Sequence, residues 1–139
     1  MYHILTILLA THYPPKDSWF NWMFGPQMLG VIFLIIGSIQ YHYPPKNINN
    51  WYGYRTDTSK RNQATWDEAQ RYSALYMIKI GLYSIVIGLL ISAILVFSRL
   101  PDGIRAAITI MFVIAGGMAP ALLMIVNTEK HLTKKFGDK

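Results

Sequence analysis

Three long apolar runs dominate this chain, and they restrict its possible folds more than any other feature of the sequence. The second and third runs, residues 80–97 and 106–126, contain no Asp, Glu, Lys, Arg or His. A chain of 139 residues cannot bury three such runs in a soluble core, and its 14% of charged residues lies well below the ~25% of soluble domains. The sequence therefore predicts an all-α integral membrane protein, a bundle of three transmembrane helices that forms one membrane domain over residues 1–139.

Prolines and capping residues set the ends of the predicted spans. Pro26 suits a first helical turn, and Pro44 disfavours helix in the residue before it, so the first span is predicted over residues 26–43. Thr65 and Glu68 match a capping box, with Thr65 as N-cap, which predicts one long helix over residues 65–98 that contains the second span. The third span is predicted over residues 104–126, and a basic tail over residues 127–139.

The long second helix exceeds the thickness of a membrane. At ~1.5 Å per residue it would measure about 50 Å, against ~30 Å for the hydrocarbon core of a bilayer. Its polar first turns are therefore predicted to extend beyond the membrane on the cytoplasmic side. At the other end of the chain, the apolar residues 4–10 are too few to cross, so residues 1–25 are predicted to form a short N-terminal interfacial or re-entrant segment.

Basic residues set the predicted orientation. Six lie between the first and second spans and four in the tail, so these two segments hold ten of the 13 Lys and Arg residues. With three spans the two segments share one side, which the positive-inside rule places in the cytoplasm, with the N-terminus outside. The net charge of +6 is then explained by anionic lipid head groups rather than by nucleic acid.

The polar, aromatic loop over residues 44–64 is the first place to look for a specific site. Arg55 presents a planar, permanently charged fork that suits a carboxylate, a phosphate or a partner peptide. The alternative is structural, with Arg55 bonded to loop carbonyls or to lipid phosphate. The predicted ligand-binding residues, in the loop and just after it, are Gly53, Tyr54, Arg55, Thr56, Ser59, Asn62 and Trp66.

No pattern in the chain indicates catalysis, a metal or a cofactor. There is no cysteine, and the four histidines are scattered without ligand spacing. The chain is therefore expected to have no catalytic residue, no metal site and no cofactor, and enzyme activity is not favoured. Small residues at Ser84, Gly88 and Ser92 lie on one helix face and predict close helix packing.

A longer pattern runs through the loop and the start of the second helix: Pro44-Pro45-Lys46-Asn47, Tyr52-Gly53-Tyr54-Arg55-Thr56, Ser59, Asn62, Trp66, Ala69 and Tyr72-Ser73. In this pattern, and over residues 44–130 as a whole, the chain resembles the SdpI family of small bacterial membrane proteins. The family is named for immunity to a secreted toxic peptide of the sporulation-delay system. Asp57 stands where many members have proline, so the family pattern does not extend to the turn after Thr56.

The resemblance implies a multi-pass protein of the bacterial cytoplasmic (inner) membrane, embedded in the lipid bilayer and without a nucleic-acid partner. The implied function is non-enzymatic binding, immunity or signalling through the cytoplasmic Gly-Tyr-Arg-Thr loop, with a toxic peptide or a cytoplasmic protein as partner. Two alternatives stay open. One is an accessory subunit of a homo-oligomeric or larger envelope complex, and the other is an enzyme that acts on a lipid or peptide at the membrane interface.

Overall fold

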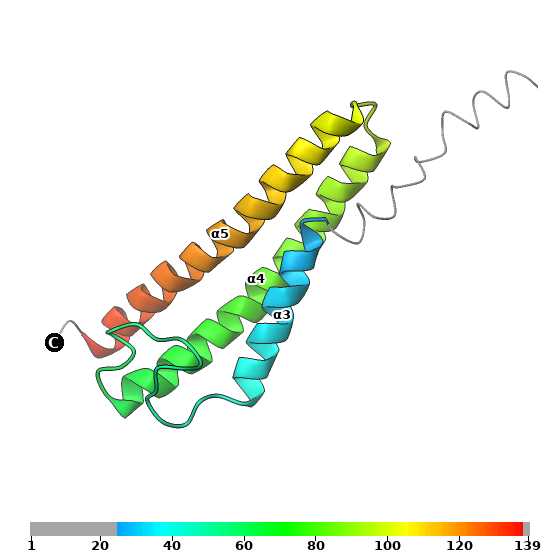
Figure 1. The fold of residues 1–139 in the computed structure, drawn as a ribbon. Coiled ribbons are helices and arrows are strands. Elements are labelled where there is room, and N and C mark those ends of the chain that lie inside the picture. Colours follow the sequence, from blue (N-terminus) through cyan, green and yellow to red (C-terminus); the bar gives the residue numbers. More distant parts are fainter. Residues whose placement is uncertain (1–24, 138–139) are drawn as a thin grey trace, which may run out of the picture.

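The computed structural model describes residues 25–137, and all regular structure within them is helical (Figure 1). Helices α3 (Gln27–His42), α4 (Gln63–Phe97) and α5 (Asp102–Phe136) follow one another in antiparallel order. Helices α4 and α5 are each long and apolar enough to cross a membrane, whereas α3 is a shorter apolar helix of 16 residues. The all-helical prediction is confirmed, while the count of three spans stays a prediction. The predicted N-terminal segment lies, apart from Gly25, outside the described residues.

Helix α3 packs on α4 through glycines, so that backbone meets backbone. A Cβ atom on Gly30 would lie 2.6 Å from the Ile85 backbone N and 2.7 Å from the Gly81 carbonyl O. A Cβ atom on Gly37 would lie 2.9 Å from the Ile78 backbone N. Real Cβ atoms do not approach backbone this closely, so these positions require glycine for the two helices to keep their separation.

The first turn of α3 is fixed by a polar contact within the apolar part of α4. The Ser92 hydroxyl donates to the Gln27 side-chain oxygen at 2.9 Å, and both residues are buried. Gly88 lies against the Gln27 backbone, where a side chain would clash. The small-residue face predicted on the second span therefore does contact another helix, at Gly88 and Ser92.

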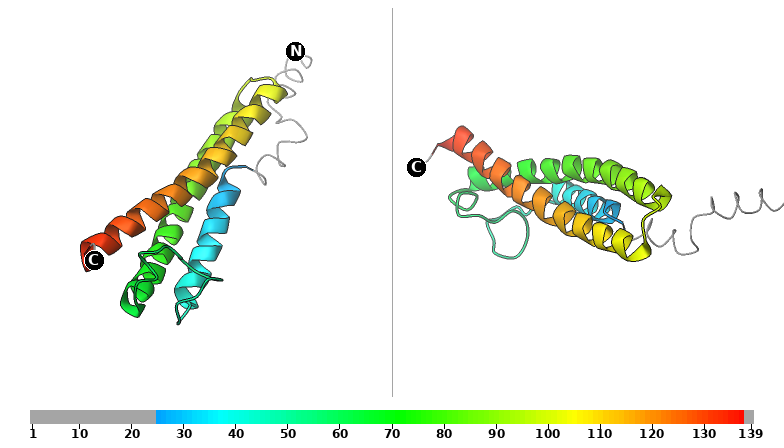
Figure 2. Two further views of the ribbon diagram at one scale, coloured as in Figure 1. Left: turned by 60° about the vertical axis from the view of Figure 1, so that its left-hand side comes forward. Right: turned by 90° about the horizontal axis from the view of Figure 1, so that it is seen from above.

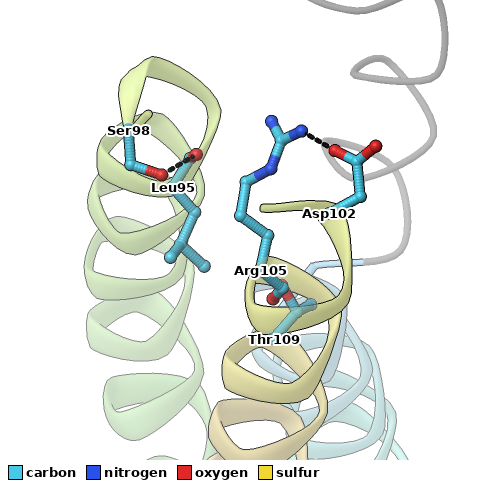
Figure 3. A network of polar contacts seen from close by, with 5 residues as sticks. All are labelled: Leu95, Ser98, Asp102, Arg105 and Thr109. Carbon is cyan, nitrogen blue, oxygen red and sulfur yellow. Dashed lines mark hydrogen bonds and ion pairs between the residues drawn. The ribbon is translucent and has the colours of Figure 1, made fainter. Parts of the chain in front are cut away.

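Residues 98–101 form a tight turn that leads from α4 back along it into α5. The Ser98 hydroxyl donates to the Leu95 carbonyl O at 2.7 Å and so satisfies the last turn of α4 (Figure 3). In the first turn of α5, Arg105 pairs with Asp102, and the Thr109 hydroxyl donates to the Arg105 carbonyl O at 2.9 Å (Figure 3). This turn produces the helical hairpin that Leu100-Pro101-Asp102-Gly103 would favour.

We call the apolar runs of α4 and α5, residues 80–97 and 106–126, the apolar zone. Within this zone, α5 packs less closely on α4 than α3 does. An apolar pocket of about 260 Å³ separates α4 from α5, with Ser84 on one side and Ala115 and Gly116 on the other. A Cβ atom on Gly116 would meet only the Leu29 side chain, at 3.9 Å. The small residues of α5 therefore leave space here instead of bringing two backbones together.

Helix α4 starts two residues earlier than predicted because its cap differs. Asn62, not Thr65, is the N-cap: the Asn62 side-chain oxygen accepts from the Thr65 N–H at 2.9 Å, and the Thr65 hydroxyl accepts from the Asn62 N–H at 3.1 Å. The prediction of Thr65 as N-cap was wrong, since asparagine caps at least as well as threonine and the same box closes three residues upstream. Glu68 does not reach back to the cap and instead contacts α5.

Helix α5 does not end where its apolar run ends but continues to Phe136. Most of the basic segment 127–139 is therefore helical. Its Leu132 side chain is 0% exposed and packs with Tyr54 and Ala69. The polar ends of α4 and α5 thus extend together beyond the apolar zone, and the loop over residues 43–62 lies beside both (Figure 1 and Figure 2).

Candidate functional site

The loop over residues 43–62 is anchored near its start by Trp66. The Trp66 side chain is 0% exposed, and its indole Nε1 donates to the Pro45 carbonyl O at 2.8 Å. Gly53 turns the chain with a φ of +93°, which side-chain-bearing residues rarely adopt. A Cβ atom there would also lie 2.8 Å from Pro45 Cγ and would clash with the Gln70 carboxamide. Glycine is therefore required at position 53 both for its conformation and for space.

Gln70 of α4 pairs with the loop backbone as a neighbouring strand would. Its buried Nε2 donates to the Tyr54 carbonyl O at 2.7 Å, and its Oε1 accepts from the Tyr54 N–H at 2.7 Å. From α3, Gln40 Nε2 donates to Gln70 Oε1 at 3.1 Å and to Ser73 Oγ at 2.9 Å. Two buried carboxamides therefore join α3, α4 and the loop.

Glu129 of α5 holds the loop from the other side. Its Oε1 accepts from the Tyr54 phenol at 2.8 Å and from the Thr56 hydroxyl at 2.7 Å. Thr56 and Ser59 close a small turn, in which the Thr56 N–H donates to Ser59 Oγ at 2.9 Å and the Ser59 N–H donates to Thr56 Oγ1 at 3.2 Å. The hydroxyl groups of Tyr54 and Thr56 thus attach the loop to a single carboxylate, and Ser59 closes the turn between them and α4.

The electrostatics of this contact favour an ionised carboxylate and a neutral phenol. Burial opposes ionisation of Glu129, but hydrogen bonds from Thr56, Thr58 and Tyr54 and the positive charge of Arg61 outweigh burial and lower its pKa. Burial, followed by the hydrogen bond and charge of Glu129, raises the pKa of the Tyr54 phenol. At neutral pH the neutral phenol therefore donates a hydrogen bond to a charged carboxylate, and such hydrogen bonds are strong.

Acid is expected to weaken this attachment. Because folding lowers the pKa of Glu129, its contribution to stability is complete above the unfolded value of about 4.3 and is lost as the pH falls through the folded value. Glu129→Gln should lower the free energy of unfolding in detergent micelles by about 1–2 kcal/mol at neutral pH, because a hydrogen bond to a charged group is replaced by one to a neutral group. The variant should also lose less stability than the wild type on acidification.

Asp57→Asn is the matched control, because it removes an exposed carboxyl from the same loop. It should keep the wild-type dependence of stability on pH. An unchanged acid dependence in Glu129→Gln would contradict the role given to this carboxylate.

A second ionic contact joins the polar ends of α4 and α5. Glu68 Oε1 lies 2.7 Å from His131 Nε2, and Glu68 Oε2 lies 2.8 Å from Lys135 Nζ. The His131 ring stacks on Tyr72 with 4.1 Å between centroids. Hydrogen bonds from Lys135 and then His131 lower the pKa of Glu68. Within residues 25–137, no three His, Asp or Glu side chains gather in a group that could hold a metal ion.

Arg55 is exposed and bonds to a loop carbonyl, as the structural alternative expected. Its guanidinium donates to the Asn50 carbonyl O, and it forms no ion pair with any acid in the part of the chain that the structure describes. A pocket of about 390 Å³ lies beside it, bounded by the loop and by all three helices. The helices line the pocket with the apolar side chains Ile36, Met77, Met124 and Ile125 and with the polar residues Gln40 and Ser73, and the loop lines it with Tyr52, Arg55 and their neighbours.

The seven predicted binding residues therefore separate into two groups. Six of them build and fasten the loop: Gly53, Tyr54, Thr56, Ser59, Asn62 and Trp66. Arg55 alone presents a charged group to the pocket.

Three residues that shape the site were absent from the prediction. Gln40 and Gln70 gave no signal, since isolated glutamines on a helix do not reveal a shared contact. Glu129 did give one, because it is the single acid among residues 127–137 of a basic segment.

The family comparison covers most of the loop and all of α4, but neither Gln40 of α3 nor Glu129 of α5. The profile of the SdpI/YfhL protein family matches residues 46–126, which is more than half of the chain. A protein of Bacillus subtilis (strain 168), described as "Uncharacterized protein YfhL", is 45% identical over 64 residues, which is 46% of this chain and 58% of that relative. The chain thus spans little more than half the length of this relative. No solved structure matches the chain. From the matched region, this chain belongs to the SdpI/YfhL protein family.

Proposed function

We propose that this protein is a non-enzymatic binding protein of the bacterial cytoplasmic membrane, which takes up a membrane-active peptide in the pocket beside Arg55. The observation that carries the proposal is an exposed guanidinium, without an acidic partner among the described residues, at the edge of a pocket whose helical walls are mostly apolar. The printed name of the Bacillus relative assigns no activity, so the peptide class rests on this chemistry and on the immunity for which the SdpI family is named.

The pocket combines an apolar wall with one positive charge, which suits a peptide that has both apolar side chains and a carboxylate. Met77, Met124 and Ile125 offer flexible and branched apolar surface on which apolar side chains of a peptide would pack. Arg55 would bind a carboxylate of the same peptide through two parallel N–H···O bonds, and only a guanidinium fork offers that geometry.

The fastening of the loop supports this use of Arg55. Its neighbour Tyr54 is held on one side by Gln70 and on the other by Glu129, so the backbone that carries the guanidinium is fixed before any ligand arrives. Binding to a fixed site loses less conformational entropy than binding that must first order a loop. The loop therefore holds the backbone of Arg55 in one place beside the pocket.

The test uses the sporulation-delay toxic peptide as probe, with the wild-type protein and three variants in lipid nanodiscs. Arg55→Ala should weaken binding of fluorescently labelled peptide at least about tenfold, since a hydrogen bond to a charged group contributes about 1.5–3 kcal/mol. Arg55→Lys should recover part of this loss, because it restores the charge but not the fork. Lys130→Ala, an exposed charge of α5 outside the pocket, should bind as the wild type does.

The same variants should protect toxin-sensitive cells in the same order, at equal protein levels. Wild-type affinity in Arg55→Ala would refute a binding role for this residue. If Arg55→Ala instead failed to accumulate in the membrane, Arg55 would belong to the fold and the proposal would also fail.

We further propose that the loop and the C-terminus face the cytoplasm. The support is the position of basic residues in and around the loop and along the end of α5. A cysteine in place of Asp102, in the turn at the opposite end of α5, should react with a membrane-impermeant maleimide in intact cells. Cysteines in place of Lys60 and Lys134 should react only after the membrane is opened, and labelling of Lys60→Cys in intact cells would reverse the orientation.

A second candidate function is that of a subunit in a larger membrane complex. It is favoured by the exposure of α5, since only 6% of its most apolar stretch is buried within the described chain. A stoichiometric protein partner after purification in mild detergent would support this candidate. A monodisperse monomer that binds the toxic peptide would speak against it.

A further inference from the structure

A second pocket lies where α3 runs into the loop, next to the polar end of α4. Its volume is about 520 Å³, and Gln40, a member of the buried carboxamide pair, lines both this pocket and the one beside Arg55. Its remaining walls include Tyr41 at the end of α3, Lys46 in the loop, and Asp67 and Arg71 on α4. None of the uses proposed for Arg55 involves this pocket.

The charges in this pocket favour an anion. Lys46 and Arg71 are both exposed, and neither forms an ion pair with an acid among residues 25–137. Asp67 supplies the opposing charge, but its Oδ1 accepts from Gln63 Nε2 at 2.7 Å. The Lys46 ammonium, from the loop, and the Arg71 guanidinium, from α4, therefore line the same pocket, with the Asp67 carboxylate beside them.

The position of the pocket, next to the start of the apolar surface of α4, indicates which anion binds there. Leu75 is the first large apolar side chain of α4 that is exposed, and Arg71 precedes it by one helical turn, about 5–6 Å along the axis. Tyr41 and Tyr43 are exposed at the same end of α3, where aromatic residues mark a membrane interface. Lipid phosphates lie in this layer, just outside the hydrocarbon core.

From this arrangement we infer that the pocket between Lys46 and Arg71 binds the phosphate of an anionic phospholipid. Arg71 would bind two phosphate oxygens in parallel, and Lys46 would add a point charge from the loop. Tyr41 would line the path of the glycerol backbone toward the bilayer. The inference does not depend on the function proposed for the Arg55 pocket.

The experiment titrates palmitoyl-oleoyl phosphatidylglycerol onto delipidated protein in neutral detergent and counts bound lipids by native mass spectrometry. Lys46→Ala and Arg71→Ala should each weaken binding of the first lipid about fivefold, the usual share of one basic residue at an anionic lipid surface. Asp67→Asn, which removes the opposing charge, should strengthen it. Arg55→Ala and Lys130→Ala should leave it unchanged, and a phosphatidylcholine probe should bind more weakly to the wild type.

Three results would overturn the inference. Equal weakening in Lys130→Ala and Lys46→Ala would mean a diffuse attraction by net charge rather than a site. Weaker binding in Asp67→Asn would mean that the carboxylate assists a different ligand. Competition by millimolar glycerol phosphate as strong as that by the lipid would assign the pocket to a soluble phosphate compound. All five substituted side chains are exposed, so unchanged unfolding of each variant in the same detergent serves as the fold check.

Discussion

Replacing Gly30 by alanine is expected to separate α3 from α4 and to destabilise the whole bundle. The added Cβ atom would lie 2.6 Å from one backbone atom of α4 and 2.7 Å from another, and backbone cannot move aside as a flexible side chain can. Overpacking of this kind costs about 1–3 kcal/mol, and a contact between two backbones belongs at the upper end. The free energy of unfolding in mixed detergent micelles should fall accordingly.

Gly116→Ala is the matched control in the same apolar zone. Its Cβ atom would approach only the end of the Leu29 side chain, at 3.9 Å. Alanine is favoured over glycine inside a helix by about 0.5–1 kcal/mol, so this variant should be as stable as the wild type or more so. Equal losses in the two variants would mean that the α3–α4 contact is not as close as described.

Gln70→Leu should release the loop while the helices remain formed. Leucine fills a similar volume but offers no polar atoms, so the buried Tyr54 N–H would lose its partner and the Tyr54 carbonyl O would keep only the bond from Ser59 Oγ, at 3.3 Å. A buried backbone group without a partner costs about 1–3 kcal/mol, so the variant should lose about 1–3 kcal/mol of stability. Trypsin should then cleave after Arg55 and Lys60 much faster than in the wild type.

Ala64→Leu provides the comparison, because Ala64 is exposed in the first turn of α4 and the substitution adds the same side chain without removing a hydrogen bond. It should change stability by less than about 0.5 kcal/mol and leave the rate of cleavage unaltered. Slow cleavage in Gln70→Leu would show that Glu129 and Trp66 hold the loop without the carboxamide.

Much of the helical framework could be predicted, because hydrophobic length and helix breakers are local signals. The long second helix was placed over residues 65–98 and is observed as Gln63–Phe97, since no breaker interrupts the chain before Pro101. The end of α5 was less accessible to prediction. Loss of apolar character predicts the end of a span, yet the polar turns after Val126 continue as helix, because Leu132 and Glu129 find partners on the loop and α4.

The candidate site could be located from sequence but not understood from it. Gly53, Tyr54 and Thr56 stood out as an unusual cluster, yet which of them would face a ligand depended on partners far away in the chain. Gln70 and Glu129 lie 16 and 75 residues from Tyr54. A pattern read along one segment cannot reveal that the motif hydroxyls are already committed to a carboxylate on another helix.

The glycine contacts also determine how this protein can move. Gly30 and Gly37 place α3 against the backbone of α4 at two separate levels, and Gly88 adds a third at the start of α3. A shift of α3 by one residue along α4 would bring side chains into all three places at once. Helix α5 has no such backbone contacts at Gly116 and is joined to α4 and the loop by side chains: the carboxylates of Glu68 and Glu129, the hydrogen bond from Asn127 to Tyr76, and the packing of Leu132. The Arg55 pocket is lined by α5 on one side and by α3 and α4 on the other, so a molecule bound there would contact the closely packed pair and the more loosely packed helix at once.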